Sequence, residues 1–406
     1  MRVPERPLSR VEFVALLALM TSIVAMSTDL MLPALGEIAR ELAAPGQNDG
    51  QLVITSLFLG LAAGQLLAGP LSDALGRRPV IFIGYGVFLV GTLLSLWTSD
   101  FTVMLVGRVL QGLGAAGPRV IATAVIRDCY QGRAMAQILS VITAVFILVP
   151  MVAPAIGQGI IYGFGWRATF GFLALVGLIT LAWYWLRQPE TLAPTDQRPF
   201  RPGVIWRGAR EALSHRVTLG ATFSIGFMFA PFIGYLSASQ QIFQQTYATG
   251  AWFPLWFAAG ALCFGAASLV NSRLVMRLGM RLLTRWALVS NFGCAMIFLA
   301  PVLLFGGVPP FWAFLAWLAP MLFCLGIGFG NLNALAMEPL GRMAGMGAAL
   351  VGCISTLIAL PFGWLVGAGY DGGLWSLVGG YAGFGFLSFL CFRWAVHGLP
   401  EHAGNA

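Results

Sequence analysis

The sequence predicts an all-α membrane protein with twelve transmembrane helices in two pseudo-symmetric six-helix bundles, and two observations support this fold class. First, 58% of the 406 residues are hydrophobic and only 9% are charged, whereas a soluble protein carries about 25% charged residues. Second, the hydrophobic residues form blocks of about 20 residues, the length that an α-helix needs to cross a bilayer. Strands of a membrane β-barrel would be about ten residues long and would alternate in polarity.

The apolar blocks follow one another along the whole chain. They cover residues 11–34, 51–71, 79–97, 101–125, 135–161, 167–186, 217–240, 251–271, 282–305, 311–334, 345–368 and 374–395. The first block is too long for the apolar core of a signal peptide, so we expect it to be the first span. A polar segment at residues 187–216 contains four prolines and separates six blocks from six. We therefore expect bundles at 1–186 and 217–406, joined by a cytoplasmic linker at 187–216.

The basic residues predict the orientation in the membrane. The chain carries 23 of them, and each is an arginine. If the N-terminus is cytoplasmic, nearly every arginine outside the spans falls on the cytoplasmic side, and only Arg40 and Arg167 fall on the other. Because cytoplasmic loops are enriched in arginine and lysine, we expect a multi-pass protein of the inner (plasma) membrane with both termini in the cytoplasm.

Several classes of site are excluded by the residue types present. The net charge of +8 is accounted for by the cytoplasmic arginines, and no arginine-rich run interleaved with aromatics favours nucleic-acid binding. The six cysteines are scattered without a CxxC pair, and the three histidines have no metal-binding spacing, so we expect no disulfide and no metal site. Neither HExxH nor a Ser/His/Asp set is present, which argues against an enzyme and against a bound cofactor.

Asp29 is the only carboxylate well inside an apolar block. Ionisable side chains within membrane spans are costly and usually functional. Because an apolar environment disfavours the charged form of a carboxyl group, we expect Asp29 to bind and release one proton in each transport cycle. The alternative is structural, since the run Ser27-Thr28-Asp29 before Pro33 could cap a helix at the outer interface.

The fourth span carries two arginines, Arg108 and Arg119, whose spacing of eleven residues places them on one face of a helix, with Gln111 close to that face. A charged face of this kind is expected to point into the bundle. There Arg108 would bias the charge state of Asp29 or bind substrate, and Arg119 would lie nearer the cytoplasm. The alternatives are a structural ion pair or carbonyl contact and, for Arg119, snorkelling to the interface.

A methionine and four polar residues are weaker candidates for the wall of a substrate cavity. They are Met26, Tyr235, Gln240, Asn331 and Asn333. A flexible methionine suits varied ligands, and a polar group within a span needs a partner or water. The polar residues could equally tie helices together.

The strongest motif lies between the second and third blocks and reads Gly69-Pro70-Leu71-Ser72-Asp73-Ala74-Leu75-Gly76-Arg77-Arg78-Pro79. It resembles the complete loop signature of the major facilitator superfamily. A glycine at position 76 permits a tight turn, and Asp73 could oppose the positive N-terminus of another helix. Arg77 and Arg78 could pair with Asp128 in the next inner loop. The resemblance implies a gating loop formed by Gly69, Asp73, Gly76, Arg77, Arg78 and Asp128, which latches the transporter in one state.

The stretch at residues 271–281 is similar to a decayed second copy of this signature. Gly279 and Arg281 remain, but Met276 stands in place of the acid. The difference predicts that charges of this kind latch one side of the molecule only.

Three further stretches resemble the drug:proton antiporter branch of the superfamily. Residues 29–35 are similar to the Bcr/CflA subfamily, and residues 108–115 are similar to the proton-linked arginine motif. Pro150, Pro154 and Gly157 match the antiporter motif of the fifth span, although Ala153 and Gln158 stand where glycines are usual.

These resemblances imply the major facilitator fold and a proton-coupled secondary transporter. Its function would be multidrug efflux by alternating access, hence antibiotic resistance, with the proton gradient as energy source and small lipophilic or amphipathic compounds, phenicols among them, as substrates. The alternative is a transporter of one specific metabolite, by uptake or export. We expect a monomer whose partners are substrate, protons and the lipid bilayer, without nucleic acid.

Overall fold

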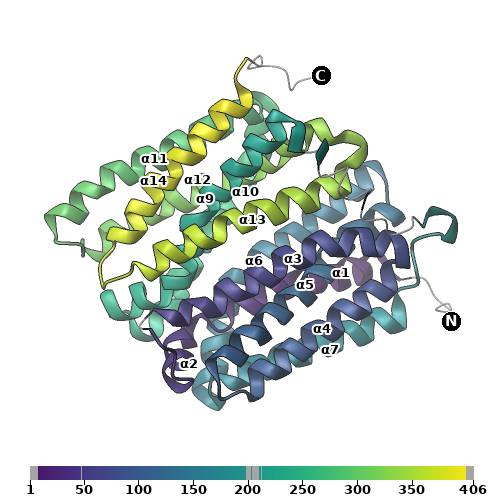
Figure 1. The fold of residues 1–406 in the computed structure, drawn as a ribbon, viewed down its shortest axis with the longest axis horizontal. Coiled ribbons are helices and arrows are strands. Elements are labelled where there is room, and N and C mark those ends of the chain that lie inside the picture. The colour runs from purple at the N-terminus through teal and green to yellow at the C-terminus, as the bar shows by residue number, and fades with distance from the viewer. Residues whose placement is uncertain (1–7, 47, 198–202, 204–209, 212, 399–406) are drawn as a thin grey trace. The chain divides into compact units, whose positions relative to one another are not determined.

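The computed structural model describes residues 8–46, 48–197, 203, 210, 211 and 213–398 (Figure 1). Within these residues it contains twelve helices that are long and apolar enough to cross a membrane, which confirms the predicted number of spans. No β-strand occurs in this part of the chain. Of the predicted linker, residues 198–202, 204–209 and 212 lie outside the described residues, as do the ends of the chain at 1–7 and 399–406.

The helices follow the predicted blocks closely. Those of the first half are α1 (Arg10–Asp29), α2 (Leu35–Glu41), α3 (Leu52–Leu75), α4 (Arg77–Trp97), α5 (Phe101–Cys129), α6 (Gly132–Phe164) and α7 (Arg167–Arg187). Those of the second half are α9 (Arg216–Gln240), α10 (Phe253–Leu278), α11 (Met280–Leu304), α12 (Phe311–Met337), α13 (Ala344–Ala368) and α14 (Trp375–Val396). A π-helical stretch, Gln241–Thr246, extends α9.

The first span is interrupted, which the sequence analysis did not anticipate. The α-helix α1 ends at Asp29, a 3₁₀ turn covers Leu32–Ala34, and α2 then continues the span. Proline has no backbone N–H and so cannot donate to the carbonyl group four residues before it, here that of Asp29, and Pro33 accounts for the break. Asp29 therefore lies at a helix end within the span.

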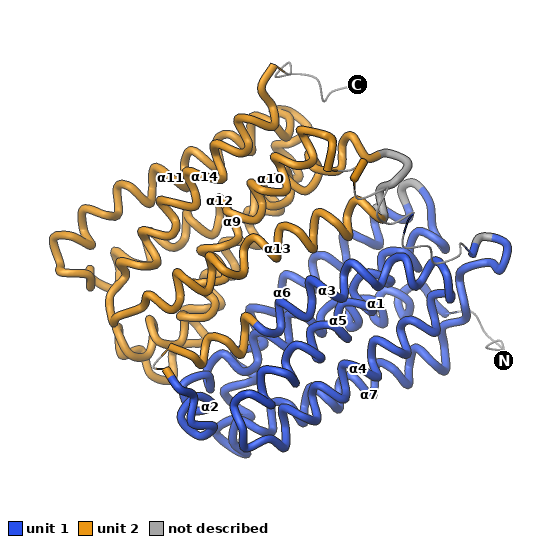
Figure 2. The backbone as a smooth tube through the Cα atoms, in the orientation of Figure 1, with its two compact units in different colours: residues 1–45, 56–205 blue, residues 46–55, 206–406 orange. Residues whose placement is uncertain are grey.

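The chain divides into two compact units (Figure 2). Unit 1 consists of residues 1–45 and 56–205, and unit 2 consists of residues 46–55 and 206–406. The short segment 46–55, which includes the first turn of α3, thus belongs to unit 2, whereas the sequence analysis assigned it to the first bundle.

Within unit 1, small residues allow helices α3 and α5 to approach closely. A Cβ atom on Gly60 would lie 1.9 Å from the carbonyl oxygen of Val109, and one on Gly112 would lie 1.9 Å from the carbonyl oxygen of Leu57. Neither glycine can be replaced without separating the backbones, which is the small-residue packing typical of membrane helices.

Within unit 2, hydroxyl groups join helices that lie far apart in the sequence. Ser224 on α9 and Ser388 on α14 are buried, and each hydroxyl donates to the other residue's carbonyl oxygen, at 2.9 and 2.8 Å.

Many large apolar side chains of both units stay exposed, among them Ile83, Val90, Leu175, Leu262, Ile297 and Leu303. An apolar surface of this extent is expected where helices contact lipid.

Candidate functional site

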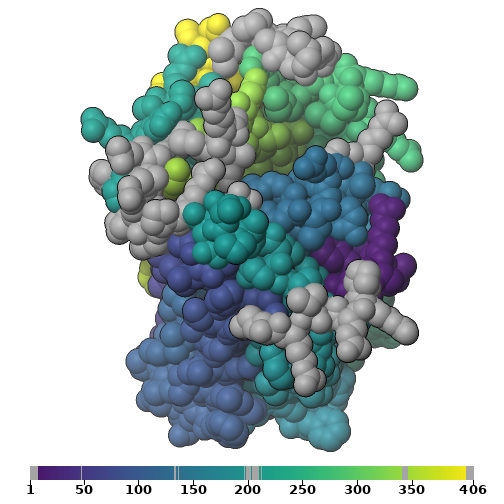
Figure 3. All heavy atoms as spheres, turned by 90° about the vertical axis from the view of Figure 1, so that its right-hand side faces the viewer, coloured from purple at the N-terminus to yellow at the C-terminus, as the bar shows by residue number. Residues whose placement is uncertain are grey.

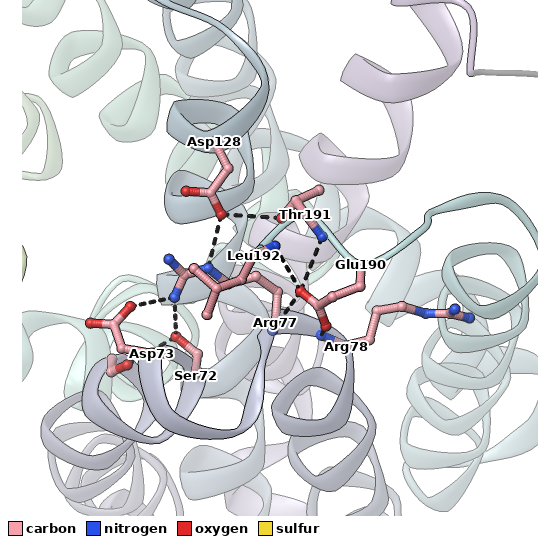
Figure 4. Close-up of polar contacts among 9 residues, drawn as sticks. Ser72, Asp73, Arg77, Arg78, Asp128, Glu190, Thr191 and Leu192 are labelled. Carbon is pink, nitrogen blue, oxygen red and sulfur yellow. Dashed lines mark hydrogen bonds and ion pairs between the residues drawn. The ribbon is translucent and has the colours of Figure 1, made fainter. Parts of the chain in front are cut away.

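The turn between α3 and α4 gathers the charged residues of the loop signature around Arg77 (Figure 4). The side chain of Arg77 is only 3% exposed. Its Nε donates to Oδ2 of Asp128 at 3.0 Å, and one terminal nitrogen donates to Oδ1 of Asp73 at 2.5 Å and to the hydroxyl of Ser72 at 2.8 Å. The predicted contact between Arg77 and Asp128 is therefore confirmed.

Arg78 does not share this role. Its guanidinium donates to the carbonyl oxygen of Trp185 at 2.8 Å and lies 5.4 Å from the centre of the Phe82 ring. Among the described residues no bond joins Arg78 to Asp128, so that part of the prediction is wrong. Arg78 instead contacts the end of α7, to which Trp185 belongs.

The acid that meets the N-terminus of α4 is Glu190. Asp73, near the end of α3, pairs with Arg77 across the turn to α4. The carboxylate of Glu190 accepts hydrogen bonds from the backbone nitrogens of Arg77 and Arg78, both at 2.9 Å. Those nitrogens belong to the first turn of α4 and have no partner within the helix. That Asp73 opposes the N-terminus of another helix stays a prediction, and Glu190 is a residue that the sequence analysis missed.

Gly69 begins the loop signature on α3, and a Cβ atom there would meet nothing within 4 Å. Its carbonyl oxygen accepts at 2.9 Å from the hydroxyl of Ser72, which itself accepts from Arg77, and the gating role of Gly69 stays a prediction.

The second copy of the signature also carries an ion pair. Gly279 has a φ of +76°, in the same turn position as Gly76 with its φ of +98°. Arg281 donates to Glu338 at 3.2 Å. Although Met276 replaces the acid of the motif, Glu338 directly after α12 supplies a carboxylate, so the expectation of charge pairing in the first copy alone is corrected.

Arg108 and Asp29 both lie buried inside unit 1. Arg108 is 0% exposed and Asp29 is 4% exposed. The guanidinium of Arg108 donates to the carbonyl oxygen of Ser27 at 2.8 Å and lies 5.8 Å from the centre of the Phe170 ring. Arg108 is thus bonded to α1 two residues before Asp29, and it faces the protein and not lipid.

Gln111 extends this contact into a chain of hydrogen bonds. Its side-chain oxygen accepts from Arg108, and its Nε2 donates at 2.9 Å to the hydroxyl of Thr92, which in turn donates to the carbonyl oxygen of Phe88. Arg108, Gln111 and Thr92 are all 0% exposed. A buried chain of satisfied polar groups of this kind fixes the orientation of the arginine.

Asp29 is a buried acid without a partner in the part of the chain that the structure describes. No hydrogen bond or ion pair of its carboxyl group is found there. The helix-cap alternative is not supported, because the 3₁₀ turn after α1 is preceded by Met31 and α2 by Ala34, and neither start has a side-chain cap. Asp29 is the last residue of α1 and not the first of a following helix.

Arg119 lies apart from this pair. It is half-buried, and its guanidinium lies 5.5 Å from the centre of the Phe146 ring on α6. A guanidinium at this distance from an aromatic face gains a cation–π interaction. Arg119 therefore contacts α6, whereas Arg108 contacts α1.

The antiporter-like stretch of α6 meets the break in the first span. Pro150 is half-buried and Pro154 buried in this helix, and a Cβ atom on Gly157 would lie 1.9 Å from the carbonyl oxygen of Leu30. Only glycine leaves room for that carbonyl group. The residue after Asp29 is thus packed directly on the stretch that resembles the antiporter motif.

The weaker cavity candidates have mostly local partners. Met26 is half-buried on α1 and packs against the apolar core of unit 1. In unit 2 the ring of Tyr235 is stacked on Phe257 with centroids 6.2 Å apart. Gln240 is 8% exposed and donates to Gln244 at 2.8 Å.

The two asparagines of α12 are bound within unit 2. Asn331 and Asn271 exchange two amide hydrogen bonds at 3.1 and 2.8 Å, joining α12 to α10. Asn333 donates to the carbonyl oxygen of Phe329 in its own helix at 2.8 Å. These contacts favour the helix-tying alternative for Asn331, and a ligand contact of either residue stays a prediction.

The sequence analysis also missed an amide cluster in unit 2. Gln51 donates to Gln241 at 2.8 Å and to the carbonyl oxygen of Gly367 at 3.0 Å. Gln241 donates to Asn48 at 2.9 Å, and Asn48 donates to the carbonyl oxygen of Tyr370 at 2.8 Å. These contacts hold segment 46–55 on α9 and on the end of α13, which explains why this segment belongs to unit 2.

The described residues contain no group of three or more histidine, cysteine or acidic side chains that could hold a metal ion.

Comparison with known proteins identifies the family. Residues 17–363 match the Major Facilitator Superfamily. A Bicyclomycin resistance protein homolog from Haemophilus influenzae is 30% identical over 371 residues, which cover 87% of this chain and 88% of that protein. The uncharacterized MFS-type transporter YdgK of Bacillus subtilis is 27% identical, with 88% and 89% covered. The multidrug resistance protein MdtL of Salmonella typhimurium is 37% identical over 174 residues, or 41% of this chain and 43% of MdtL.

A solved structure shares the fold. The human organic anion transporter MFSD10 (TETRAN) superposes with a TM-score of 0.68 over 95% of this chain and 99% of that chain, at 16% identity. An identity this low supports the fold alone. Taken with the twelve spans and the loop signature, the sequence matches show that this multi-pass membrane protein is a transporter, not an enzyme, and that it belongs to the major facilitator superfamily.

Proposed function

We propose that this transporter exports small lipophilic or amphipathic compounds in exchange for protons, by alternating access. The observation that carries the proposal is the buried carboxyl group of Asp29, which has no hydrogen bond or ion pair among the described residues, two residues from the carbonyl group that binds the buried Arg108. A partnerless carboxyl group in this setting can change its protonation state without breaking a salt bridge. Arg108 is bonded to the carbonyl group of Ser27, two residues before Asp29, and we propose that it makes the charge state of Asp29 depend on substrate.

The driving force is sufficient for uphill export. One proton moving inward gains about 2.3 kcal/mol per 100 mV of membrane potential, plus the pH gradient. No cofactor is needed in this scheme, because the proton gradient is the energy source. Gln111 and Thr92 keep Arg108 in place. A change of charge at Asp29 would therefore change the electrostatic energy of a guanidinium whose position is fixed.

The substrate class is supported by two kinds of observation. The names of two relatives refer to bicyclomycin resistance and multidrug resistance, which favours drug efflux and antibiotic resistance. Unit 2 places half-buried aromatic rings on its spanning helices, with Phe229 against Phe329 at 5.5 Å and Phe232 against Phe264 at 6.3 Å. Aromatic surfaces favour apolar and planar compounds such as phenicols.

The remaining parts of the proposal rest on the sequence pattern. The arginine distribution supports the inner (plasma) membrane with both termini in the cytoplasm. The six-plus-six division supports two bundles at 1–186 and 217–406 that move about a midplane site, with the cluster around Arg77 as the gating latch. We propose a monomer that binds small-molecule substrate, protons and lipid, and no nucleic acid.

The test replaces Asp29→Asn and compares it with Glu37→Gln, which removes an exposed carboxylate from the same span. Both variants and the wild type are produced in cells that lack their own pumps and are challenged with bicyclomycin, a phenicol and a panel of other toxic compounds. Proton release driven by each compound is then measured in inverted membrane vesicles.

We expect broad protection and compound-driven proton movement for wild type and Glu37→Gln, and neither for Asp29→Asn at equal amounts of folded protein. Undiminished pH-dependent export by Asp29→Asn would refute the role of this acid. Wild-type uptake of a single labelled nutrient, without protection by the panel, would favour the metabolite transporter instead.

A further inference from the structure

The carboxylate of Glu190 is bound by four backbone nitrogens at once. Oε1 accepts from the nitrogens of Arg77, Thr191 and Leu192 at 2.9, 3.0 and 3.0 Å, and Oε2 accepts from that of Arg78 at 2.9 Å. Two of these nitrogens open α4, and two belong to Glu190's own segment directly after α7. A negative charge at a helix N-terminus is stabilised by the helix dipole and by the unpaired N–H groups there. Glu190 thus joins the start of the linker to the start of α4.

The glycine of the loop signature makes room for this carboxylate. Gly76 has a φ of +98°, and a Cβ atom on it would lie 2.8 Å from Oε2 of Glu190. A side chain at position 76 would therefore be strained in the backbone and would also displace Glu190. The absence of a side chain at Gly76 thus leaves space for Glu190, an acid that lies outside the signature.

The same segment also reaches the charged cluster around Arg77. The hydroxyl of Thr191 donates at 3.1 Å to Oδ2 of Asp128, the oxygen that accepts from Nε of Arg77 at 3.0 Å. Figure 4 shows Glu190 and Thr191 on the loop segment that passes over Arg77. Figure 3 shows this teal segment on the surface beside the blue residues of α3 and α4. Glu190 thus binds the backbone of Arg77, and Thr191 binds Asp128, the residue that accepts from the Arg77 side chain.

We propose that Glu190 is a positioning residue for transport, which fixes Arg77 and the beginning of the linker to the loop signature so that they change conformation as one unit. The inference rests on the proposed transport function, because it concerns a conformational step of the transport cycle. Glu190 lies at a loop outside the spans and touches no candidate substrate residue. Its removal should therefore slow the conformational step and leave substrate binding unchanged.

The sequence repeats the feature in the second half of the chain. Pro189-Glu190 follows the sixth span, and Pro400-Glu401 follows the twelfth. The second pair lies outside the described residues. The repeated sequence is what is expected if an acid after the last helix of each half serves a common purpose.

The experiment compares Glu190→Gln with Asp100→Asn in the full-length protein. Asp100 is a matched control because its carboxylate also accepts from a helix N-terminus, the backbone nitrogen of Val103 on α5 at 2.9 Å, but outside the loop signature. Hydrogen exchange of the Arg77 and Arg78 amides is measured in nanodiscs. Transport of bicyclomycin and of a phenicol is measured in proteoliposomes with an imposed pH gradient, giving kcat and KM separately.

For Glu190→Gln we expect exchange of the two amides to accelerate about tenfold and kcat to fall about tenfold, because the amide oxygen accepts without the charge and the NH2 group cannot accept at all. We expect KM to stay within about twofold, because a residue that acts on the conformational step removes no ground-state binding of substrate. Asp100→Asn should change neither the exchange of these amides nor kcat. If Glu190→Gln fails to fold, Thr191→Val serves as the second variant, since it removes the bond to Asp128 and leaves the carboxylate in place; it should lower kcat without accelerating exchange at Arg78.

Three outcomes would overturn the proposal: unchanged exchange at Arg77 and Arg78, an unchanged kcat in a folded variant, or an equal loss of kcat in Asp100→Asn. Wild-type proteoliposomes that move no compound would contradict the proposed function, whereas the exchange measurement would still decide whether Glu190 holds the turn.

Discussion

Replacement of Gly112 by alanine tests the close packing that surrounds the buried arginine. Gly112 lies on α5, next to Gln111 and one turn after Arg108, where it faces the backbone of α3. A Cβ atom there would lie 1.9 Å from the carbonyl oxygen of Leu57, and 2.9 Å from both the carbonyl carbon of Leu57 and the nitrogen of Leu61. All three obstacles are backbone atoms, so no side-chain rotation can relieve the clash.

The size of the effect follows from these distances. Carbon and carbonyl oxygen pack no closer than about 3.3 Å, so α3 and α5 would have to separate locally by about 1.4 Å. Overpacking of this kind costs about 1–3 kcal/mol. For a unit of this size, a loss of about 2 kcal/mol corresponds to a fall in melting temperature of roughly 4–8 °C. Because Arg108 and Gln111 are on the same helix, the shift should also weaken their contacts and reduce transport.

The assay is thermal unfolding of the purified protein in one detergent, followed by intrinsic fluorescence. Gly86→Ala is the matched control, since it makes the same chemical change inside helix α4 at a position where a Cβ atom meets nothing within 4 Å. It should leave the melting temperature unchanged or raise it slightly, because alanine favours the helix over glycine. Equal melting temperatures of the Gly112→Ala and Gly86→Ala proteins would refute the packing argument.

Two further predictions concern unit 2. Asn331→Leu should lower the free energy of unfolding by about 1–3 kcal/mol, because it leaves the amide of Asn271 without its partner. The double variant Asn271→Leu/Asn331→Leu should recover most of that loss, as measured by melting temperature. Gln51→Ala removes the hydrogen bonds to Gln241 and to the carbonyl group of Gly367. It should accelerate hydrogen exchange in segment 46–55 and leave α9 protected.

Each of these predictions has its own contrary result. A double asparagine variant that is less stable than the single one would show that the amide pair is not the relevant unit. Asn333→Leu is the control there, because in the described part of the chain the side chain of Asn333 bonds within its own helix. For Gln51→Ala, unchanged exchange across residues 48–55 would mean that apolar contacts and not the amide cluster hold this segment.

The architecture was predictable because the signals are local. Charge depletion and apolar blocks of membrane length fix the number of helices, and proline and glycine set their ends. The tight turn at Gly76 and the contact between Arg77 and Asp128 followed from the motif. The interruption of the first span was not predicted, although Pro33 is visible in the sequence, because apolar residues continue across the break and hide it.

The partners of the site residues were less predictable, because they depend on segments far apart in the chain. Glu190 and Arg77 are 113 residues apart. The sequence analysis considered only Asp73 as an acid opposite a helix N-terminus, whereas the fold brings Glu190 to the start of α4. The sequence signals for Glu190 are that it is an acid directly after the sixth span and that a Pro-Glu pair also follows the twelfth.

The sequence by itself determined a twelve-span transporter with a lone acid, Asp29, and a lone deep arginine, Arg108, among apolar residues. Only the tertiary structure decided that Arg108 is bonded to the carbonyl group of Ser27 and to Gln111, while the carboxyl group of Asp29 has no partner in the described chain. The physical reason is that burial and helix length depend on hydrophobicity summed over neighbouring residues, whereas a hydrogen-bond partner depends on which backbone group a packed helix presents within about 3 Å.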